Sequence, residues 1–85
     1  MTLNNNGYLL MKRGDYRSAL PLLQSAVQKL QGSGRPDEAY ANYNLGYTLL
    51  QLGRCGEAAT YLQRAMRLEP ERSEPRTALA RARRC

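Results

Sequence analysis

Apolar residues recur along the chain at helical spacing, and short polar or glycine-containing segments interrupt the pattern. In the second half, Leu45, Leu49 and Leu52 recur every three or four residues until Gly53 breaks the pattern. Such spacing places apolar side chains on one face of an α-helix. The spacing resumes over residues 58–68 and ends before a proline. We therefore predict two helices in this half, separated by a turn at the glycine.

The first half of the chain repeats this pattern thirty-nine residues earlier. When residues 3–31 are aligned with residues 42–70, nine of the twenty-nine positions are identical, whereas unrelated sequences match at about one position in fifteen. The identical pairs are Asn5/Asn44, Gly7/Gly46, Tyr8/Tyr47, Leu10/Leu49, Gly14/Gly53, Ala19/Ala58, Leu23/Leu62, Gln24/Gln63 and Ala26/Ala65. The chain therefore contains an internal repeat, and each unit is expected to form two helices.

Turn and capping residues indicate where the predicted helices begin and end. Gly14 and its equivalent Gly53 suit the left-handed backbone that terminates many helices. Asp15 can cap the helix that follows Gly14. In each unit a glycine, Gly7 or Gly46, is expected where the two helices approach closely, so a larger side chain should force them apart.

These signals predict a single all-α domain over residues 1–85, with two antiparallel helix pairs and a final helix. The expected boundaries are about 1–31 for repeat one, 32–35 for the loop, 36–70 for repeat two and 73–84 for the final helix. Because Ala78, Leu79 and Ala82 share one face of the final helix, we expect it to cap the second repeat. The opposite end has no such cap, so we expect either a longer chain or pairing with another copy.

Composition narrows the function mainly through the residues that are absent. The chain has no His, Phe or Trp, and its β-branched residues are one valine and four threonines, too few for an ordinary sheet. Without histidine, the commonest general base and metal ligand is missing. The glycines mark turns and helix contacts, and none forms a phosphate-binding loop. We therefore expect no enzymatic activity, no cofactor and no metal.

The two cysteines, Cys55 and Cys85, lie thirty residues apart without a CxxC spacing. Two thiols without histidine cannot supply four zinc ligands. We expect both to be free, with Cys55 partly buried by packing and Cys85 at a mobile chain end. Free thiols favour a reducing compartment. No apolar run approaches the ~20 residues of a transmembrane helix, so we expect a cytoplasmic protein without membrane insertion.

The repeated residues follow a recognisable order. The second unit carries Asn44, Leu45, Gly46, Tyr47, Gly53, Ala58, Leu62, Ala65 and Pro70. The first unit carries Gly7, Leu10, Gly14, Tyr16, Ala19, Leu23 and Ala26. Both sets resemble the tetratricopeptide repeat, a helix-turn-helix unit of 34 residues. The longer period of thirty-nine residues is similar to the branch typified by kinesin light chain, while Asn42 and Cys55 replace an aromatic residue and a tyrosine of the usual pattern.

The resemblance implies an α-α superhelix whose concave groove binds a protein or peptide segment. Tyr40, Tyr43 and Tyr47 lie on a helical stripe beside the core leucines, so the core does not require them. Tyrosine suits this role because it combines apolar area with a hydroxyl group. The expected groove residues are Asn5, Tyr8, Met11, Tyr40, Tyr43, Asn44, Tyr47 and Leu50. The alternative is that Tyr40 and Tyr43 pack on the second helix of the preceding repeat.

One ligand class is disfavoured by the resemblance. Tetratricopeptide domains that clamp the carboxylate tails of chaperones use a lysine and an asparagine in the first repeat, where this chain has Asn4 and Tyr8. They also use basic residues near the start of the third helix, where Glu74 and Ala78 stand. Only Asn44 fits, so chaperone tails are not the expected partner.

Arginines are concentrated in the last third of a chain that carries a net charge of +6. They are Arg64, Arg67, Arg72, Arg76, Arg81, Arg83 and Arg84. One interpretation is a basic patch for nucleic acid or an acidic surface. The alternative is a solvated outer face, and no Phe or Trp stacking platform accompanies these arginines, so we do not expect a nucleic-acid partner. A third hypothesis is a structural scaffold segment of a larger protein.

Overall fold

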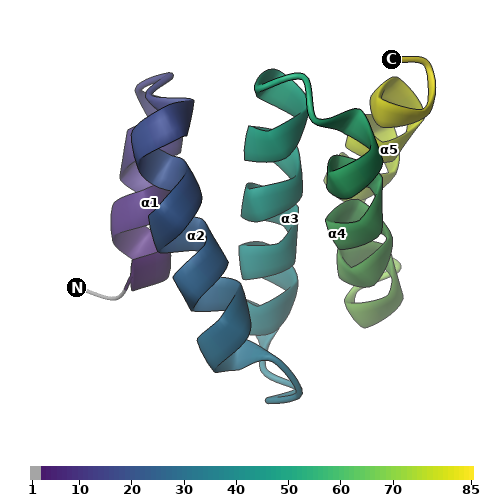
Figure 1. Ribbon diagram of the computed structural model, residues 1–85. Helices are drawn as coiled ribbons and strands as arrows, with labels where there is room; N and C mark the ends of the chain where they lie inside the picture. The colour runs from purple at the N-terminus through teal and green to yellow at the C-terminus, as the bar shows by residue number, and fades with distance from the viewer. Residues whose placement is uncertain (1–2) are drawn as a thin grey trace.

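The computed structural model describes the chain from residue 3 to residue 85, with side chains described from Asn5 onward. Five helices follow one another in this part of the chain (Figure 1). They are α1 (Leu3–Lys12), α2 (Tyr16–Leu30), α3 (Pro36–Gln51), α4 (Cys55–Leu68) and α5 (Glu74–Arg83). No strand is present between residues 3 and 85, so the predicted all-α fold class is confirmed. Residues 1 and 2, part of the predicted first repeat, lie outside the described residues.

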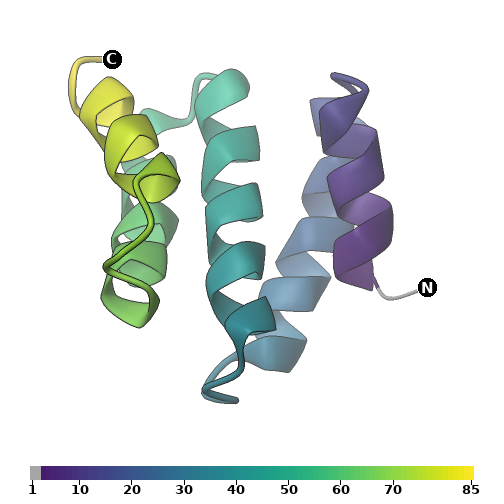
Figure 2. The same cartoon turned by 180° about the vertical axis from the view of Figure 1, so that it is seen from behind.

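The helices run in alternating directions, and α3 lies at the centre. Seen from behind, α1 and α5 lie in front of α2 and α4 (Figure 2). α3 contacts each of the other four helices. Leu45 and Leu49 on α3 are each only 1% exposed and form the middle of the core, together with Leu23 of α2 and Leu62 of α4, which are both fully buried. Because α3 has neighbours on most sides, few of its side chains reach the surface.

Nearly identical turns close the two helix pairs. Gly14 has a φ of +83° and Gly53 a φ of +81°, the left-handed backbone that the sequence predicts at both positions. The residue after each glycine donates its N–H to the carbonyl five residues earlier, at 2.9 Å in the first turn and 2.8 Å in the second. This is the six-to-one hydrogen bond of a glycine-terminated helix. The side chain of Asp15 caps α2 by accepting from the N–H of Ser18 at 3.4 Å.

Two glycines allow the helices of each pair to approach closely. A Cβ atom on Gly46 would lie 2.7 Å from Cγ of Leu62 and 3.2 Å from the backbone oxygen of Ala58. A Cβ atom on Gly7 would lie 2.7 Å from Cδ2 of Leu23. The two distances of 2.7 Å are too short for a real contact, so the predicted close approach at these glycines is confirmed.

The loop between the two helix pairs is organised by Glu38, a residue of the first turn of α3. One carboxylate oxygen of Glu38 accepts from the N–H of Gly32 and the other from the N–H of Gly34, both at 2.9 Å. The side chain is only 8% exposed, which is tolerated because both oxygens have hydrogen-bond donors. The carboxylate thus ties the end of α2 to the beginning of α3.

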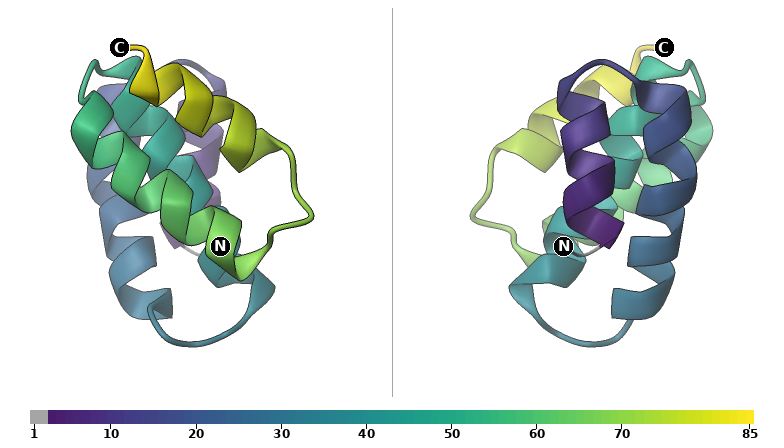
Figure 3. Two further views of the ribbon diagram at one scale, coloured as in Figure 1. Left: turned by 90° about the vertical axis from the view of Figure 1, so that its right-hand side faces the viewer. Right: turned by 90° about the vertical axis from the view of Figure 1, so that its left-hand side faces the viewer.

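The final helix packs against the second pair as its apolar face predicts. A connector over residues 69–73 extends to one side before α5 begins (Figure 3). Ala78, Leu79 and Ala82 are all at most 6% exposed, and α5 contacts both α3 and α4. The three residues expected to face inward are therefore buried.

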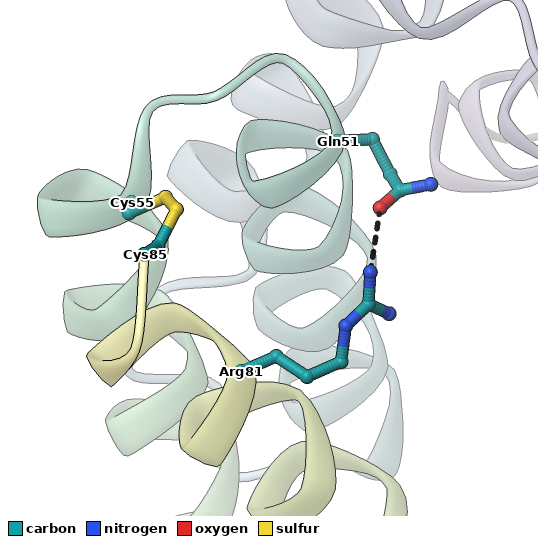
Figure 4. Close-up of a disulfide and its surroundings, with 4 residues drawn as sticks. All are labelled: Gln51, Cys55, Arg81 and Cys85. Atoms are coloured by element: carbon teal, nitrogen blue, oxygen red, sulfur yellow. Dashed lines mark hydrogen bonds between the residues drawn. A yellow bond between two sulfur atoms is a disulfide. The ribbon is translucent and has the colours of Figure 1, made fainter.

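A disulfide joins Cys55, the first residue of α4, to Cys85 just beyond α5 (Figure 4). The two Cα atoms are 6.2 Å apart, within the range that a disulfide spans. The prediction of two free thiols, with Cys85 a mobile bystander, is therefore wrong. α5 runs antiparallel to α4, so its end returns to the start of α4, and the separation of thirty residues in sequence conceals this proximity. The observation that favoured a reducing compartment is lost with the free thiols.

Candidate functional site

A hollow of about 420 Å³ opens between α1 and α3. Its lining also includes the beginning of α2 and the connector into α5. We call it the tyrosine hollow and define it by ten residues. They are Tyr8, Met11, Lys12, Tyr16, Tyr40, Tyr43, Asn44, Tyr47, Arg72 and Glu74. Five of the six tyrosines of the chain therefore line one depression.

Three of these tyrosines pack against one another in the middle of the hollow. The rings of Tyr43 and Tyr47 have centroids 6.1 Å apart and are tilted by 33°. Tyr16 meets Tyr47 edge to face, with centroids 6.3 Å apart. Such arrangements are favoured by the charge distribution of aromatic rings. Tyr47 is the shared member, so it links the beginning of α2 to the surface of α3.

At one end of the hollow, Arg72 covers Tyr40. The guanidinium carbon lies 4.0 Å from the centroid of the Tyr40 ring, and Nη2 donates to the Tyr40 hydroxyl oxygen, which raises the pKa of Arg72. Nη1 forms an ion pair with Glu74 at 3.5 Å. Nε lies 3.1 Å from Oε1 of Glu69, within ion-pair distance although the N–H is not aligned for a hydrogen bond. The charge of Arg72 is therefore matched by two carboxylates.

The opposite end carries Lys12, the last residue of α1. Its Nζ lies 5.9 Å from the centroid of the Tyr8 ring, within the range of a cation–π contact. Among the described residues, no carboxylate forms an ion pair with Lys12. The two ends of the hollow therefore differ, because one cation has acidic partners and the other has none.

Two tyrosine hydroxyl oxygens of the hollow, those of Tyr16 and Tyr40, accept hydrogen bonds from neighbouring side chains. Nε2 of Gln51 donates to the hydroxyl oxygen of Tyr16 at 3.3 Å. Nη2 of Arg81 donates to Oε1 of the same glutamine at 3.3 Å, so the chain of bonds reaches α5 (Figure 4). Burial raises the pKa of Tyr43, as do Tyr47 and Glu74, while Arg81 lowers it. The hydroxyl of Tyr43 is therefore protonated at neutral pH and can donate.

The structure brings together six of the eight residues expected to line a groove. Met11 and Asn44 form part of the floor, since they are only 6% and 3% exposed. Leu50 is 8% exposed and belongs to the core, and Asn5 lies exposed on α1 outside the lining. Tyr40 is 41% exposed, while Tyr43 lines the hollow and also packs against the core.

Four lining residues were absent from the sequence prediction. Tyr16 and Lys12 flank the glycine turn of the first pair, so the position of that turn could have predicted that these two residues lie near each other. Arg72 and Glu74 belong to the connector and the start of α5. Their place depends on the path of the connector between α4 and α5, for which the sequence gives no local signal.

The arginines of the last third lie on different helices. Arg64 and Arg67 of α4 border a second hollow of about 300 Å³, which also includes residues of α2 and α3. The Arg64 guanidinium lies 5.1 Å from the centroid of the Tyr61 ring. On α5, Arg81 donates to Gln51, Arg76 donates to the carbonyl of Pro70 at 3.1 Å, and Arg83 is exposed. Arg84, just beyond α5, is also exposed.

Between residues 3 and 85, no group of three or more His, Cys, Asp or Glu side chains is placed to hold a metal ion. No helix in this range is both long and apolar enough to span a membrane.

Antiparallel helix pairs with left-handed glycine turns and a hollow between their first helices define an α-helical repeat module. A family model described as tetratricopeptide repeat matches residues 1–71, and the chain belongs to this family. Tetratricopeptide repeats generally mediate protein–protein interaction and are typically non-enzymatic. No curated protein matches the sequence. The finer likeness to kinesin light chain stays a prediction.

Proposed function

We propose that this chain binds an extended or helical segment of a partner protein in the tyrosine hollow. The observation that carries the proposal is the convergence of five tyrosines from α1, α2 and α3 on one depression of about 420 Å³. Tyr8 and Tyr40 are 42% and 41% exposed, far more than a core aromatic residue. Exposed rings of this kind are typical of binding surfaces.

The chemistry of the hollow suits a peptide. Tyrosine rings supply apolar area at a small entropic cost because the side chain has few rotatable bonds, and their hydroxyl groups bond to backbone amides. Asn44 in the floor carries a carboxamide, which can both donate and accept. Binding is the whole mechanism, and no covalent bond is made or broken.

In this proposal the domain is the entire chain, with α1–α2 and α3–α4 as two repeats and α5 as the covering helix. A cytoplasmic location stays a prediction, and disulfides such as Cys55–Cys85 are rare in that compartment. Alkylation of thiols at the moment of lysis measures their state in the cell.

A basic patch for nucleic acid receives less support from the geometry. Arg81 and Arg76 form hydrogen bonds with other parts of the chain. On α4, the guanidinium of Arg64 covers the ring of Tyr61. A scaffold role, with the hollow filled inside a larger protein, predicts that no separate segment binds. Both alternatives are outcomes of the following experiment.

The test is selection of displayed random peptides on the intact chain, followed by measurement of individual affinities. Selected peptides should bind the double variant Tyr8→Ser with Tyr40→Ser at least about tenfold more weakly, because exposed aromatic anchors dominate such interfaces. Tyr61→Ser is the matched control, since Tyr61 lies on α4 outside the hollow.

Circular dichroism should show unchanged helicity in both variants. Equal affinity of the double variant and the intact chain would remove the hollow as the binding site. Failure to select any peptide would favour the scaffold role, whereas steep salt dependence with no effect of the tyrosines would favour the arginines.

A further inference from the structure

We infer that the disulfide between Cys55 and Cys85 is a redox clasp, which holds α5 beside the tyrosine hollow and whose reduction by a thiol weakens ligand binding there. The inference rests on the proposed function and adds a means of regulating the same site. It arises from the position of the disulfide, from the small burial of α5, and from the contacts between α5 and the lining of the hollow.

Packing alone gives α5 a weak hold on the rest of the chain. Its ten residues bury four side chains, those of Pro75, Ala78, Leu79 and Ala82. Two of the four are alanines, and Leu79 is the largest, so α5 removes little apolar area from water. An isolated helix of this length is marginal in water. The docked position of α5 therefore depends strongly on the covalent link near its end.

The start of α5 forms one wall of the hollow. Glu74, its first residue, lines the hollow and forms an ion pair with Arg72, whose guanidinium covers the ring of Tyr40. The next residue, Pro75, is buried, and together with Tyr40 and Tyr43 it lines a cavity of only about 10 Å³, so these side chains pack closely. Displacement of α5 removes this wall and one of the carboxylates that hold Arg72 over Tyr40.

The far end of α5 is joined to the hollow by two hydrogen bonds in series. Nη2 of Arg81 donates to Oε1 of Gln51, and Nε2 of Gln51 donates to the hydroxyl oxygen of Tyr16, both at 3.3 Å. Tyr16 is one of the residues that line the hollow. Movement of α5 therefore breaks a chain of contacts that ends on this lining.

The disulfide lies close to the first of these hydrogen bonds (Figure 4). Cys85 follows Arg81 by four residues, and Cys55 follows Gln51 by four residues. The crosslink and the hydrogen bond thus join the same two parts of the chain, the end of α5 and the turn between α3 and α4. While the disulfide is intact, Arg81 stays within reach of Gln51. Reduction leaves this end of α5 to an exposed hydrogen bond, which contributes little net stability.

The disulfide is accessible to a reducing thiol, since Cys85 is exposed and Cys55 is half-buried. A glutathione thiolate attacks one sulfur atom, the bond between the two cysteines breaks, and the departing thiolate takes up a proton. A second glutathione thiolate attacks the mixed disulfide, which releases the other cysteine as a thiol and forms glutathione disulfide. Two electrons thus pass from two glutathiones to the chain. The chain has two cysteines, so re-oxidation restores one internal pairing only.

The test compares the full chain in its oxidised form, after reduction by excess glutathione, and after re-oxidation. Peptides are selected on the oxidised chain, and their affinities for each form are measured at a temperature at which α1–α4 give the amide signals of a folded protein. The reduced chain should bind about three- to tenfold more weakly, because the apparent affinity scales with the fraction of molecules in which α5 is docked. Re-oxidation should restore the affinity.

A second measurement needs no ligand. The nuclear magnetic resonance signals of the Gln51 side-chain amide and of the Tyr16 ring should shift on reduction, because both groups belong to the chain of bonds that begins on α5. The methyl signals of Val27 are the internal control and should not shift, since α2 does not contact α5. A loss of overall stability without movement of α5 would leave all three signals unchanged in the folded protein.

The double variant Cys55→Ser with Cys85→Ser removes the clasp. It should bind the selected peptides like the reduced chain, whether or not glutathione is present. A response of this variant to glutathione would trace the effect to a reaction other than reduction of the disulfide and would overturn the inference.

Two arginines in the last turn of α5 provide a matched pair of variants with the disulfide intact. Arg81→Gln should shift the signal of Tyr16, because it breaks the contact with Gln51. Arg83→Gln removes the same charge from an exposed position and should leave that signal unchanged. Equal shifts in the two variants would mean that charge, rather than contact with α5, acts on the hollow, which contradicts the inference.

The outcomes separate the inference from the proposed function. Equal affinities of the oxidised and reduced forms, with unchanged signals of Gln51 and Tyr16, would overturn the clasp and leave peptide binding in place. Tighter binding to the reduced form would show that α5 obstructs the hollow and would also overturn the clasp. If no peptide binds any form, the proposed function is wrong and the inference falls with it.

Discussion

The first helices of the two repeats, α1 and α3, carry the same residues in very different surroundings. Asn5 is exposed whereas Asn44 is 3% exposed, and Tyr8 is 42% exposed whereas Tyr47 is half-buried. The cause is the number of neighbours, since α3 contacts four helices, whereas α1 contacts α2 and part of α3. Identical residues are therefore more buried in the second repeat than in the first.

The helices on the two sides of α3 also differ in how they are held to one another. α4 and α5 are joined by a disulfide, whereas within the described residues no disulfide joins α1 to α2. The C-terminal side is thus constrained both covalently and by burial. We expect α1 to open at lower free energy than α5 when the chain is oxidised.

The largest expected effect comes from removing the disulfide. Cys55→Ser combined with Cys85→Ser should lower the free energy of unfolding by about 2–4 kcal/mol, because the crosslink closes a loop of thirty residues in the unfolded chain. Urea denaturation measures the change. Hydrogen exchange should show that protection of α5 falls toward that of α1.

The intact chain treated with a dithiol reductant is the control and should match the double variant. Reduction converts the disulfide to two thiols while the reductant becomes a disulfide, so no other bond in the chain changes. Equal stability before and after reduction would mean that the crosslink contributes nothing and that packing alone holds α5.

The second-largest expected effect is the loss of stability when either glycine at a close helix contact is replaced by alanine. Gly46→Ala should destabilise by about 2 kcal/mol, because the new Cβ meets both Leu62 and the backbone oxygen of Ala58 on α4, a helix that packs on α3 and α5 and is crosslinked to Cys85. Gly7→Ala meets Leu23, but α1 can shift outward, so its cost should be about 1 kcal/mol or less.

Gly56→Ala is the matched control for both glycines. Nothing lies within 4 Å of a Cβ at this exposed position of α4, so alanine should be neutral or stabilising by up to about 1 kcal/mol. Thermal and urea denaturation of the three variants measure the order. Equal costs at Gly7 and Gly46 would contradict the view that neighbours, rather than the repeat itself, set the rigidity of each helix.

The fold was predictable because its signals are local or repeated. The glycine turns, the cap at Asp15 and the apolar spacing each act within a few residues, and the identical pairs fixed the division into units. The position of Leu50 was less predictable, because a stripe on one helix does not reveal which of its residues a neighbouring helix covers. Its burial depends on tertiary packing.

Six of the ten residues that line the tyrosine hollow were predicted from the sequence, and the other four depend on tertiary packing or on the position of a turn. Tyr8, Tyr40, Tyr43 and Tyr47 lie on first helices, where periodicity identifies the stripe. Arg72 comes from a connector whose path is set by α5. The disulfide, too, depends on the return of α5 to the start of α4, so spacing in the sequence could not reveal it.

The smallest effect concerns the starts of the second helices, where the repeats differ at equivalent positions. α2 is capped by Asp15, whose side chain accepts from the N–H of Ser18, and Asp15→Ala should cost about 1 kcal/mol. At the equivalent positions of α4, Arg54 donates to both carboxylate oxygens of Glu57, at 2.9 and 2.7 Å. Both side chains are exposed, so Glu57→Gln should cost less than the loss of the cap.

The pH dependence of Glu57→Gln tests this assignment. Hydrogen bonding to Arg54 lowers the pKa of Glu57 in the folded state. The unfolded chain therefore binds the proton more readily, and the stabilisation by Glu57 is present above the unfolded pKa and lost as pH falls through the lowered folded pKa. The difference between the intact chain and Glu57→Gln should be measurable by urea denaturation at neutral pH and should shrink as the pH falls through the lowered folded pKa. A difference that persists in acid would mean that Glu57 acts through packing rather than through its charge.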